Sequence, residues 1–149
     1  MATRNSPDLP ALTGPPLKPG KYVKLSVHFK KRPDISDEYF FTYWANNHVS
    51  AFLATTVGHG KIKGYSQHHV TAEMKEMAKG LGMPVLDCDG VSELWAESAE
   101  DFKGLFELPE VRKIAADDNP IFSLPPDSVV LGFDHVIWDR REGTKEGTE

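Results

Sequence analysis

The chain has 149 residues, 40% of them hydrophobic, and a formal net charge of -5 at pH 7. This length and composition fit one domain with a moderate core, and the acidic balance with scattered Lys and Arg argues against a nucleic-acid surface. The single cysteine, Cys88, cannot form an internal disulfide, which favours a reducing compartment, the cytoplasm. The absence of a long apolar segment argues against a membrane span.

Both ends of the chain have compositions that disfavour regular structure. Residues 1–20 are dense in Pro and Gly and predict a flexible arm, whereas the charged, Gly-rich residues 141–149 predict a disordered tail. The folded domain is therefore expected over residues 21–140.

The first half of this domain predicts two strands and a long helix. Residues 21–31 alternate between apolar and polar side chains, as a half-buried strand does. Ser36 is a suitable N-cap for a helix that closes before Gly58, because acidic residues fill its first turn. Residues 60–71 predict a second strand with weaker alternation.

The second half predicts two further strands and interrupted helices. A short helical turn and a loop are expected over residues 72–89, and a third strand over residues 90–98. Residues 99–122 have apolar side chains at helical spacing, interrupted around Pro109. Residues 127–140 predict a fourth strand that is apolar on both faces.

The resulting order, β-α-β-β-α-β, predicts a ferredoxin-like α+β sheet with helices on one face. Because the fourth strand is apolar on both faces, we expect two copies to pair their sheets across a two-fold axis as a homodimer. In this order the first and fourth strands are expected at opposite edges of the sheet, or to close a barrel through the partner. No contact between His28 and His135 is therefore predicted.

One stretch of the long helix carries Tyr43, Trp44 and His48 within six residues. Histidine titrates near neutral pH, so an imidazole against an aromatic wall is suited to general acid-base catalysis. His48 is thus the first catalytic candidate, and Tyr43 is a candidate to bind substrate by positioning one of its oxygen atoms. The alternative is a helix-end histidine bonded to a carbonyl.

Other histidines are weaker candidates. His69 shares its strand face with Tyr65 and Gln67, which are placed to hold a substrate carbonyl; the alternative is a histidine whose hydrogen bonds are satisfied by a neighbouring strand. His28 is a third catalytic candidate and His135 a substrate-binding one; the alternative for both is a core or interface role.

No metal site is predicted. His68 and His69 are adjacent on a strand and point to opposite faces, so they cannot hold one ion together with Glu73. The aromatic residues Trp44 and Trp95 are candidates to stack on a planar substrate or are simply core. Asp118 and Phe122 are candidates to cap the pocket; the alternative for Asp118 is a local backbone acceptor.

Four motifs in the same order resemble those of one family. "RPDISDEYFFTYWANNH" is similar to the opening motif of EthD-type members of the dimeric α+β barrel superfamily, and "GYSQHH", "DGVSELW" and "DDNPIF" are similar to their later motifs. The family commonly has an acidic residue at the position of Asn119. The Pro-rich arm and the Met-bearing segment resemble the fungal branch of this family.

The resemblance implies a cofactor-independent enzyme of secondary metabolism, of the kind that decarboxylates, cyclises or dehydrates aromatic polyketide intermediates. We therefore predict a lyase, first a decarboxylase, acting on an aromatic polyketide or phenolic acid through His48 or His69. One alternative is a cofactor-free monooxygenase of anthrone-type substrates, in which the same histidine deprotonates a phenol. A second alternative is a dimeric binding module without catalysis.

Overall fold

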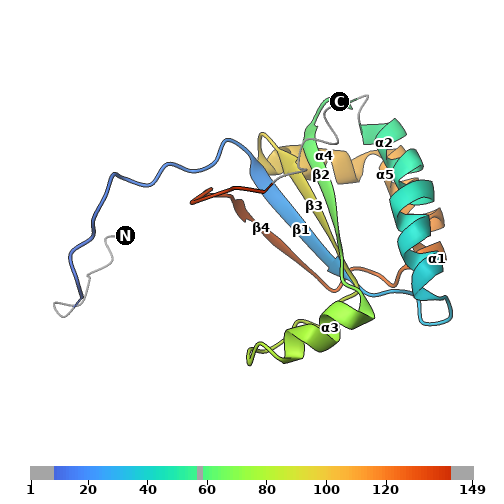
Figure 1. Cartoon of the computed structure of the whole chain (residues 1–149). Helices are drawn as coiled ribbons and strands as arrows, with labels where there is room; N and C mark the ends of the chain where they lie inside the picture. The colour runs from blue at the N-terminus through green and yellow to red at the C-terminus, as the bar shows by residue number, and fades with distance from the viewer. Residues whose placement is uncertain (1–8, 57–58, 142–149) are drawn as a thin grey trace.

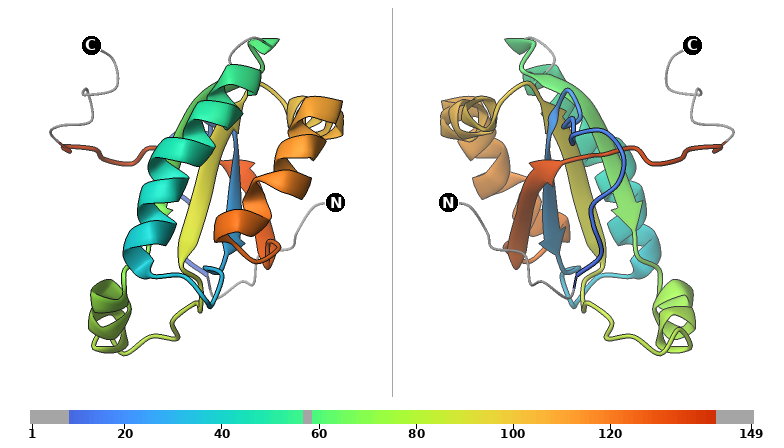
Figure 2. Two further views of the ribbon diagram at one scale, coloured as in Figure 1. Left: turned by 90° about the vertical axis from the view of Figure 1, so that its right-hand side faces the viewer. Right: turned by 90° about the vertical axis from the view of Figure 1, so that its left-hand side faces the viewer.

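The structure is a computed structural model that describes residues 9–56 and 59–141 (Figure 1). Within these ranges, four antiparallel strands form one sheet in the order β2-β3-β1-β4. They are β1 (Val23–Phe29), β2 (Ile62–His69), β3 (Gly90–Ala96) and β4 (Ser128–Phe133). The long helices cover one face of the sheet and leave the other face open (Figure 2). The predicted ferredoxin-like α+β fold is confirmed.

The first helical segment begins as predicted but is not uniform. α1 (Asp37–Thr42) starts at Ser36, whose side-chain oxygen accepts a hydrogen bond from the Tyr39 amide. A π-helical segment, η1 (Tyr43–His48), follows, and α2 (Val49–Thr56) completes the segment. The π-helical turn, which was not predicted, interrupts the segment at its chemically richest residues.

The remaining helices follow the predicted breaks. α3 (Ala72–Lys79) extends beyond the end of the sheet (Figure 1). α4 (Ala99–Glu107) and α5 (Pro109–Asp117) are separated at Leu108, since proline fits the first turn of a helix but not its interior. α6 (Asn119–Phe122) is a single turn. No helix in the described part of the chain has the length and apolar character needed to span a membrane.

Two expectations about the fourth strand are wrong. β4 does not lie at the opposite edge from β1 but pairs with it directly, with Val23 opposite Phe133. β4 also ends at Phe133 rather than near residue 140, because β1 begins at this last pair and provides no further partner. Upstream of β1, the Gly20 amide still donates a hydrogen bond to the Asp134 carbonyl. The residues before Gly20 are rich in proline and offer few amide hydrogens with which β4 could continue to pair. His135 is therefore not a strand residue.

The ends of the chain are only partly described. Residues 9–20 of the predicted arm contain neither helix nor strand and are largely exposed. Residues 1–8 of this arm and residues 142–149 of the predicted tail lie outside the described residues, as do residues 57 and 58 at the predicted end of the long helix.

The core consists of two clusters on the helix-covered face. One lies between the sheet and the helices α2, α4 and α5, and the other gathers Phe29, Phe40, Trp44 and Phe122. Gly90 makes the second cluster possible, because a Cβ atom at this position would lie 2.8 Å from the Trp44 ring. The glycine thus lets the indole pack directly against β3.

Candidate functional site

A cleft of about 870 Å³ lies between the sheet and the helices of one protomer. Its walls are mainly apolar and come from all four strands, from the π-helical segment η1 and from the helices α2, α4, α5 and α6. The polar side chains that line it include those of His48, Tyr65, Ser92 and Asn119. A few polar groups in an apolar cavity are typical of a small-molecule site.

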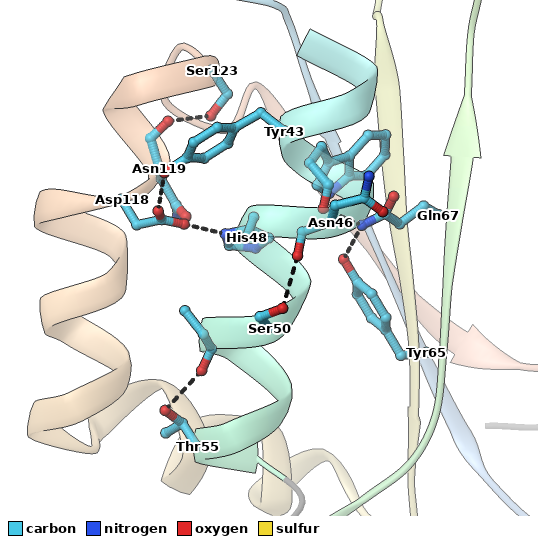
Figure 3. A network of polar contacts seen from close by, with 12 residues as sticks. Tyr43, Asn46, His48, Ser50, Thr55, Tyr65, Gln67, Asp118, Asn119 and Ser123 are labelled. Carbon is cyan, nitrogen blue, oxygen red and sulfur yellow. Dashed lines mark hydrogen bonds and ion pairs between the residues drawn. The ribbon is translucent and has the colours of Figure 1, made fainter. Parts of the chain in front are cut away.

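His48 is held in the wall of this cleft by Asp118 (Figure 3). Its Nδ1 lies 2.6 Å from Asp118 Oδ2, and the Tyr43 hydroxyl donates to Asp118 Oδ1 at 2.6 Å. The imidazole is flanked by the rings of Phe52 and Phe122, with centroids 5.9 and 5.0 Å away. His48 is only 8% exposed, so the carboxylate fixes the ring in a largely apolar environment.

The π-helical turn explains how Tyr43 and His48 reach the same carboxylate. In an α-helix, with about 3.6 residues per turn, side chains five residues apart point roughly 140° away from each other. A π-helix closes hydrogen bonds between residues five apart and brings such side chains onto one face. The turn from Tyr43 to His48 therefore directs both side chains toward Asp118. π-Helical turns occur frequently at functional sites.

The arrangement sets the proton positions at His48. A carboxylate only accepts hydrogen bonds, so Nδ1 carries the hydrogen and Nε2 keeps its lone pair. Burial, together with the hydrogen bond to Asp118, raises the pKa of Tyr43 to about 12, so this phenol stays neutral and donates. The site can therefore take up a proton at Nε2 while Asp118 stabilises the imidazolium that forms.

A second network links β2 to the π-helical turn. Gln67 Nε2 donates to the Trp44 carbonyl and to the Tyr65 hydroxyl, both at 3.0 Å, and Gln67 Oε1 lies 2.8 Å from His69 Nε2. Burial raises the pKa of Tyr65 despite the hydrogen bonds around it. Burial also lowers the pKa of His69, with a smaller contribution from the charge of His68, so the neutral imidazole is favoured.

The predicted grouping of Tyr65, Gln67 and His69 on one strand face is present, but the three side chains have different surroundings. Tyr65 lines the cleft. The imidazole of His69 stacks on Phe41 and Trp44, with centroids 4.8 and 4.7 Å away. Of the residues predicted to bind substrate, Trp44 and Phe122 line the cleft. Tyr43 and Asp118, predicted for the same role, hydrogen-bond to each other, and Asp118 also contacts His48.

Three predicted site residues lie elsewhere. His28 and Trp95 occupy the open face of the sheet, where Trp95 Nε1 donates to Asp134 Oδ2 at 3.0 Å. Nδ1 of His28 is buried without a hydrogen-bond partner in the described part of the chain. His135 is exposed after β4 and lines a separate surface hollow. The structure does not bring these three residues to the cleft.

Sequence reasoning missed several residues of the cleft. Ser92 contributes a hydroxyl, and Asn119, noted only as a departure from the family pattern, lines the wall. The apolar residues of α4 and α5 have the helical spacing of a surface that packs on a core. The same spacing also fits a cavity wall, because a core and an apolar cleft require similar side chains. The pairing of His48 with Asp118 spans 70 residues, and its only sequence signal is that both lie in family-like motifs.

Fold and site together define a class: ferredoxin-like α+β proteins with an apolar cleft between sheet and helices. Residues 32–124, most of the folded region, match the EthD domain. The chain therefore belongs to the EthD domain family. No curated protein matches the sequence.

Solved structures with the same fold share little sequence with the chain. HapK from Hahella chejuensis has a TM-score of 0.54 and 10% identity, with 81% of this chain and 99% of that chain covered. A dimeric ferredoxin-like protein of unknown function from Bacteroides fragilis has a TM-score of 0.51 and 16% identity, with coverages of 78% and 98%. A hydroxynitrile lyase from Passiflora edulis has a TM-score of 0.50 and 13% identity, with coverages of 81% and 100%. These similarities support the fold.

Proposed function

We propose that the chain is a lyase that acts on an aromatic polyketide or phenolic acid through acid-base catalysis by His48, with no metal or organic cofactor required. Decarboxylation is the first reaction to consider, and cyclisation or dehydration the second. The observation that carries this proposal is the Tyr43–Asp118–His48 network in the wall of an apolar cleft.

The network suits proton transfer at carbon. A decarboxylation requires a proton at the carbon that loses carbon dioxide, and a cyclisation requires removal of a proton beside a carbonyl. His48 can serve both, because Nδ1 is occupied by Asp118 and Nε2 remains to exchange a proton with substrate. Asp118 orients the ring and stabilises its charged form, as a carboxylate does beside a catalytic histidine.

The cleft supports a planar, largely apolar substrate. Aromatic rings from the sheet and from the helices face it, among them Phe29, Phe52, Phe106 and Phe122. Burying an aromatic ring against such walls is favourable, and offset or edge contacts add to the gain. The few polar groups at His48, Tyr65 and Asn119 would orient the oxygen atoms of the substrate.

The direct test is incubation of the purified chain, without added metal or cofactor, with a panel of hydroxylated aromatic and polyketide acids under anaerobic conditions. Loss of carbon dioxide or water by mass spectrometry, abolished in His48→Gln but retained in His68→Gln, would support the lyase. His68 is a matched control because it lies on β2 and is exposed.

Other outcomes of the same test would overturn the proposal. An oxygen-dependent gain in mass would indicate the monooxygenase, in which His48 deprotonates a phenol that then reacts with dioxygen. Binding of the panel without turnover would indicate the binding module. Full activity in His48→Gln would remove the catalytic role of His48.

We also propose that the chain forms a homodimer through β4 and the residues that follow it. Val129, Val130, Leu131 and Phe133 are each 52–60% exposed and come from both faces of this edge strand. Trp138 is 73% exposed. A second copy with the same patch would bury this surface, as a two-fold interface requires.

Light scattering should give a dimer mass for the wild type and a monomer mass for the double variant Val130→Lys with Leu131→Lys. The control is Met77→Lys, at an exposed apolar position on α3.

A further inference from the structure

We propose that the Tyr65 hydroxyl is a hydrogen-bond donor to a substrate oxygen on which negative charge develops. This inference rests on the proposed function and deepens it, because it restricts the substrate class. The substrate would be an acid or ketone whose reacting carbon is conjugated with an oxygen atom. Hydroxyl groups ortho or para to a departing carboxylate meet this condition, and a meta hydroxyl does not.

The direction of the hydrogen bonds around Gln67 leads to this assignment. A backbone carbonyl only accepts, so the Gln67 amide must turn its NH₂ end toward the Trp44 carbonyl. The second hydrogen of this NH₂ group is then directed to the Tyr65 oxygen. On its other side, Gln67 Oε1 accepts from His69 Nε2, which fits the same orientation of the amide. Both ends of the amide are therefore fixed, and Figure 3 shows the bond of its nitrogen to Tyr65.

The Trp44 carbonyl sets the orientation of the Gln67 amide. It belongs to the π-helical turn, where the regular i to i+4 pattern of backbone hydrogen bonds is interrupted. Here the carbonyl accepts from a side chain on the neighbouring strand β2. The same turn thus directs His48 toward Asp118 and sets the orientation of Gln67.

The consequence concerns the hydrogen of the Tyr65 hydroxyl. Its oxygen accepts from Gln67, so its own hydrogen must point to a different acceptor. Among the described residues the Ser92 side chain lies beside this hydroxyl, and both line the cleft, where a substrate oxygen can accept the same hydrogen. The rings of Tyr65 and His48 both contact Phe52, at centroid distances of 5.4 and 5.9 Å. The donor and the proton-exchanging imidazole therefore serve the same part of the cleft.

The atoms and electrons of a decarboxylation balance for a hydroxylated aromatic acid that binds as its phenolate. Protonated His48 delivers the proton to the carbon bearing the carboxylate, a C–H bond forms, and the phenolate oxygen becomes a carbonyl. The bond to the carboxylate then breaks, carbon dioxide leaves, and the electron pair moves through the ring to the carbonyl oxygen. The Tyr65 hydroxyl stabilises the phenolate that results. His48 regains its proton from solvent.

A binding experiment tests the donor without turnover. Substituted phenols of graded acidity and their methyl ethers are titrated into the full chain, with quenching of tryptophan fluorescence as the signal. In Tyr65→Phe the phenolates should bind about ten- to a hundredfold more weakly, the range for one hydrogen bond to a charged oxygen, and the ethers about equally. Gln67→Leu should act in the same direction, whereas Ser66→Ala, on the opposite face of β2, should not. Equal losses for phenolates and ethers would overturn the inference.

Turnover then separates this inference from the proposed function. With an ortho-hydroxy acid, Tyr65→Phe should raise KM and lower kcat/KM about ten- to a hundredfold, because the phenolate oxygen is charged in the bound substrate and regains its charge as carbon dioxide leaves. If His48→Gln abolishes turnover while Tyr65→Phe leaves both KM and kcat/KM unchanged, the donor role fails and the lyase stands. If His48→Gln remains active, the proposed function fails, and selective loss of phenolate binding in Tyr65→Phe would still support the donor.

Discussion

His48 and His69 both lie against aromatic rings of the same cluster, yet their hydrogen-bond partners differ in charge. His48 bonds to the carboxylate of Asp118, and its ring lines the cleft. His69 bonds to the neutral amide of Gln67 and stacks on Trp44 and Phe41. The carboxylate orients the His48 ring and can stabilise an imidazolium formed during proton transfer, whereas burial lowers the pKa of His69 and favours its neutral form. The sequence alone offered both histidines as catalytic candidates. Their hydrogen-bond partners in the structure separate the roles that we expect for them.

The largest expected effect comes from replacing His48, and the same replacement at His69 should have a much smaller one. His48→Gln should lower kcat by about 10²- to 10⁴-fold, the usual contribution of a general acid or base. His69→Gln should lower kcat less than tenfold, since this residue acts only through Gln67. Steady-state kinetics on the substrate found in the panel would measure both. Equal losses of kcat in the two variants would contradict a catalytic role for His48 alone.

The charge of the partner itself can be removed. Asp118→Asn should lower kcat by about 10²-fold or more, because an amide NH₂ turned toward His48 Nδ1 would shift the hydrogen to Nε2 and remove the basic site. Asp117→Asn is the matched control, since this neighbouring carboxylate is exposed and pairs with Lys113. Similar kcat values for the two variants would show that the carboxylate at 118 has no catalytic role.

The environment of His69 depends directly on Trp44, which stacks on it, and Trp44 shares its core cluster with Phe122, which flanks His48. Gly90→Ala would place a Cβ atom 2.8 Å from the Trp44 ring, so we expect a loss of about 1–3 kcal/mol in the free energy of unfolding. Gly132→Ala on β4 is the control, because its added Cβ meets no atom within 4 Å. Urea denaturation compares the two variants, and equal stabilities would mean that Trp44 moves without cost.

The smallest effect concerns pH. The pKa of His69 is lowered by burial from its usual value of 6.5, so between the two values the unfolded chain binds more protons than the folded one. The free energy of unfolding should therefore rise with pH through this window and fall on acidification. His69→Gln should show a smaller loss between pH 7 and pH 5 than the wild type, measured by urea denaturation, whereas exposed His135→Gln should match the wild type. An unchanged slope in His69→Gln would be inconsistent with a buried neutral imidazole.

Local signals in the sequence determined the elements of the fold. The alternation of Val23, Leu25 and Phe29 specified a strand, because side chains in a strand point to alternate faces. The Ser36 cap and the break before Pro109 specified helix ends through hydrogen bonds and sterics that involve only near neighbours. The order of these elements was sufficient for the ferredoxin-like class, and the motifs were sufficient for the EthD family.

Tertiary structure alone decided the end of β4 and the partners of the histidines. β4 ends at Phe133 because its neighbour β1 begins at Val23, a fact about pairing that the alternation of residues 127–140 does not contain. Asp118 meets His48 across 70 residues, and a π-helical turn brings Tyr43 to the same carboxylate. Local periodicity describes which face of an element is apolar. The partner of a polar side chain on that face depends on how distant elements pack, and here that packing separates His48 from His69.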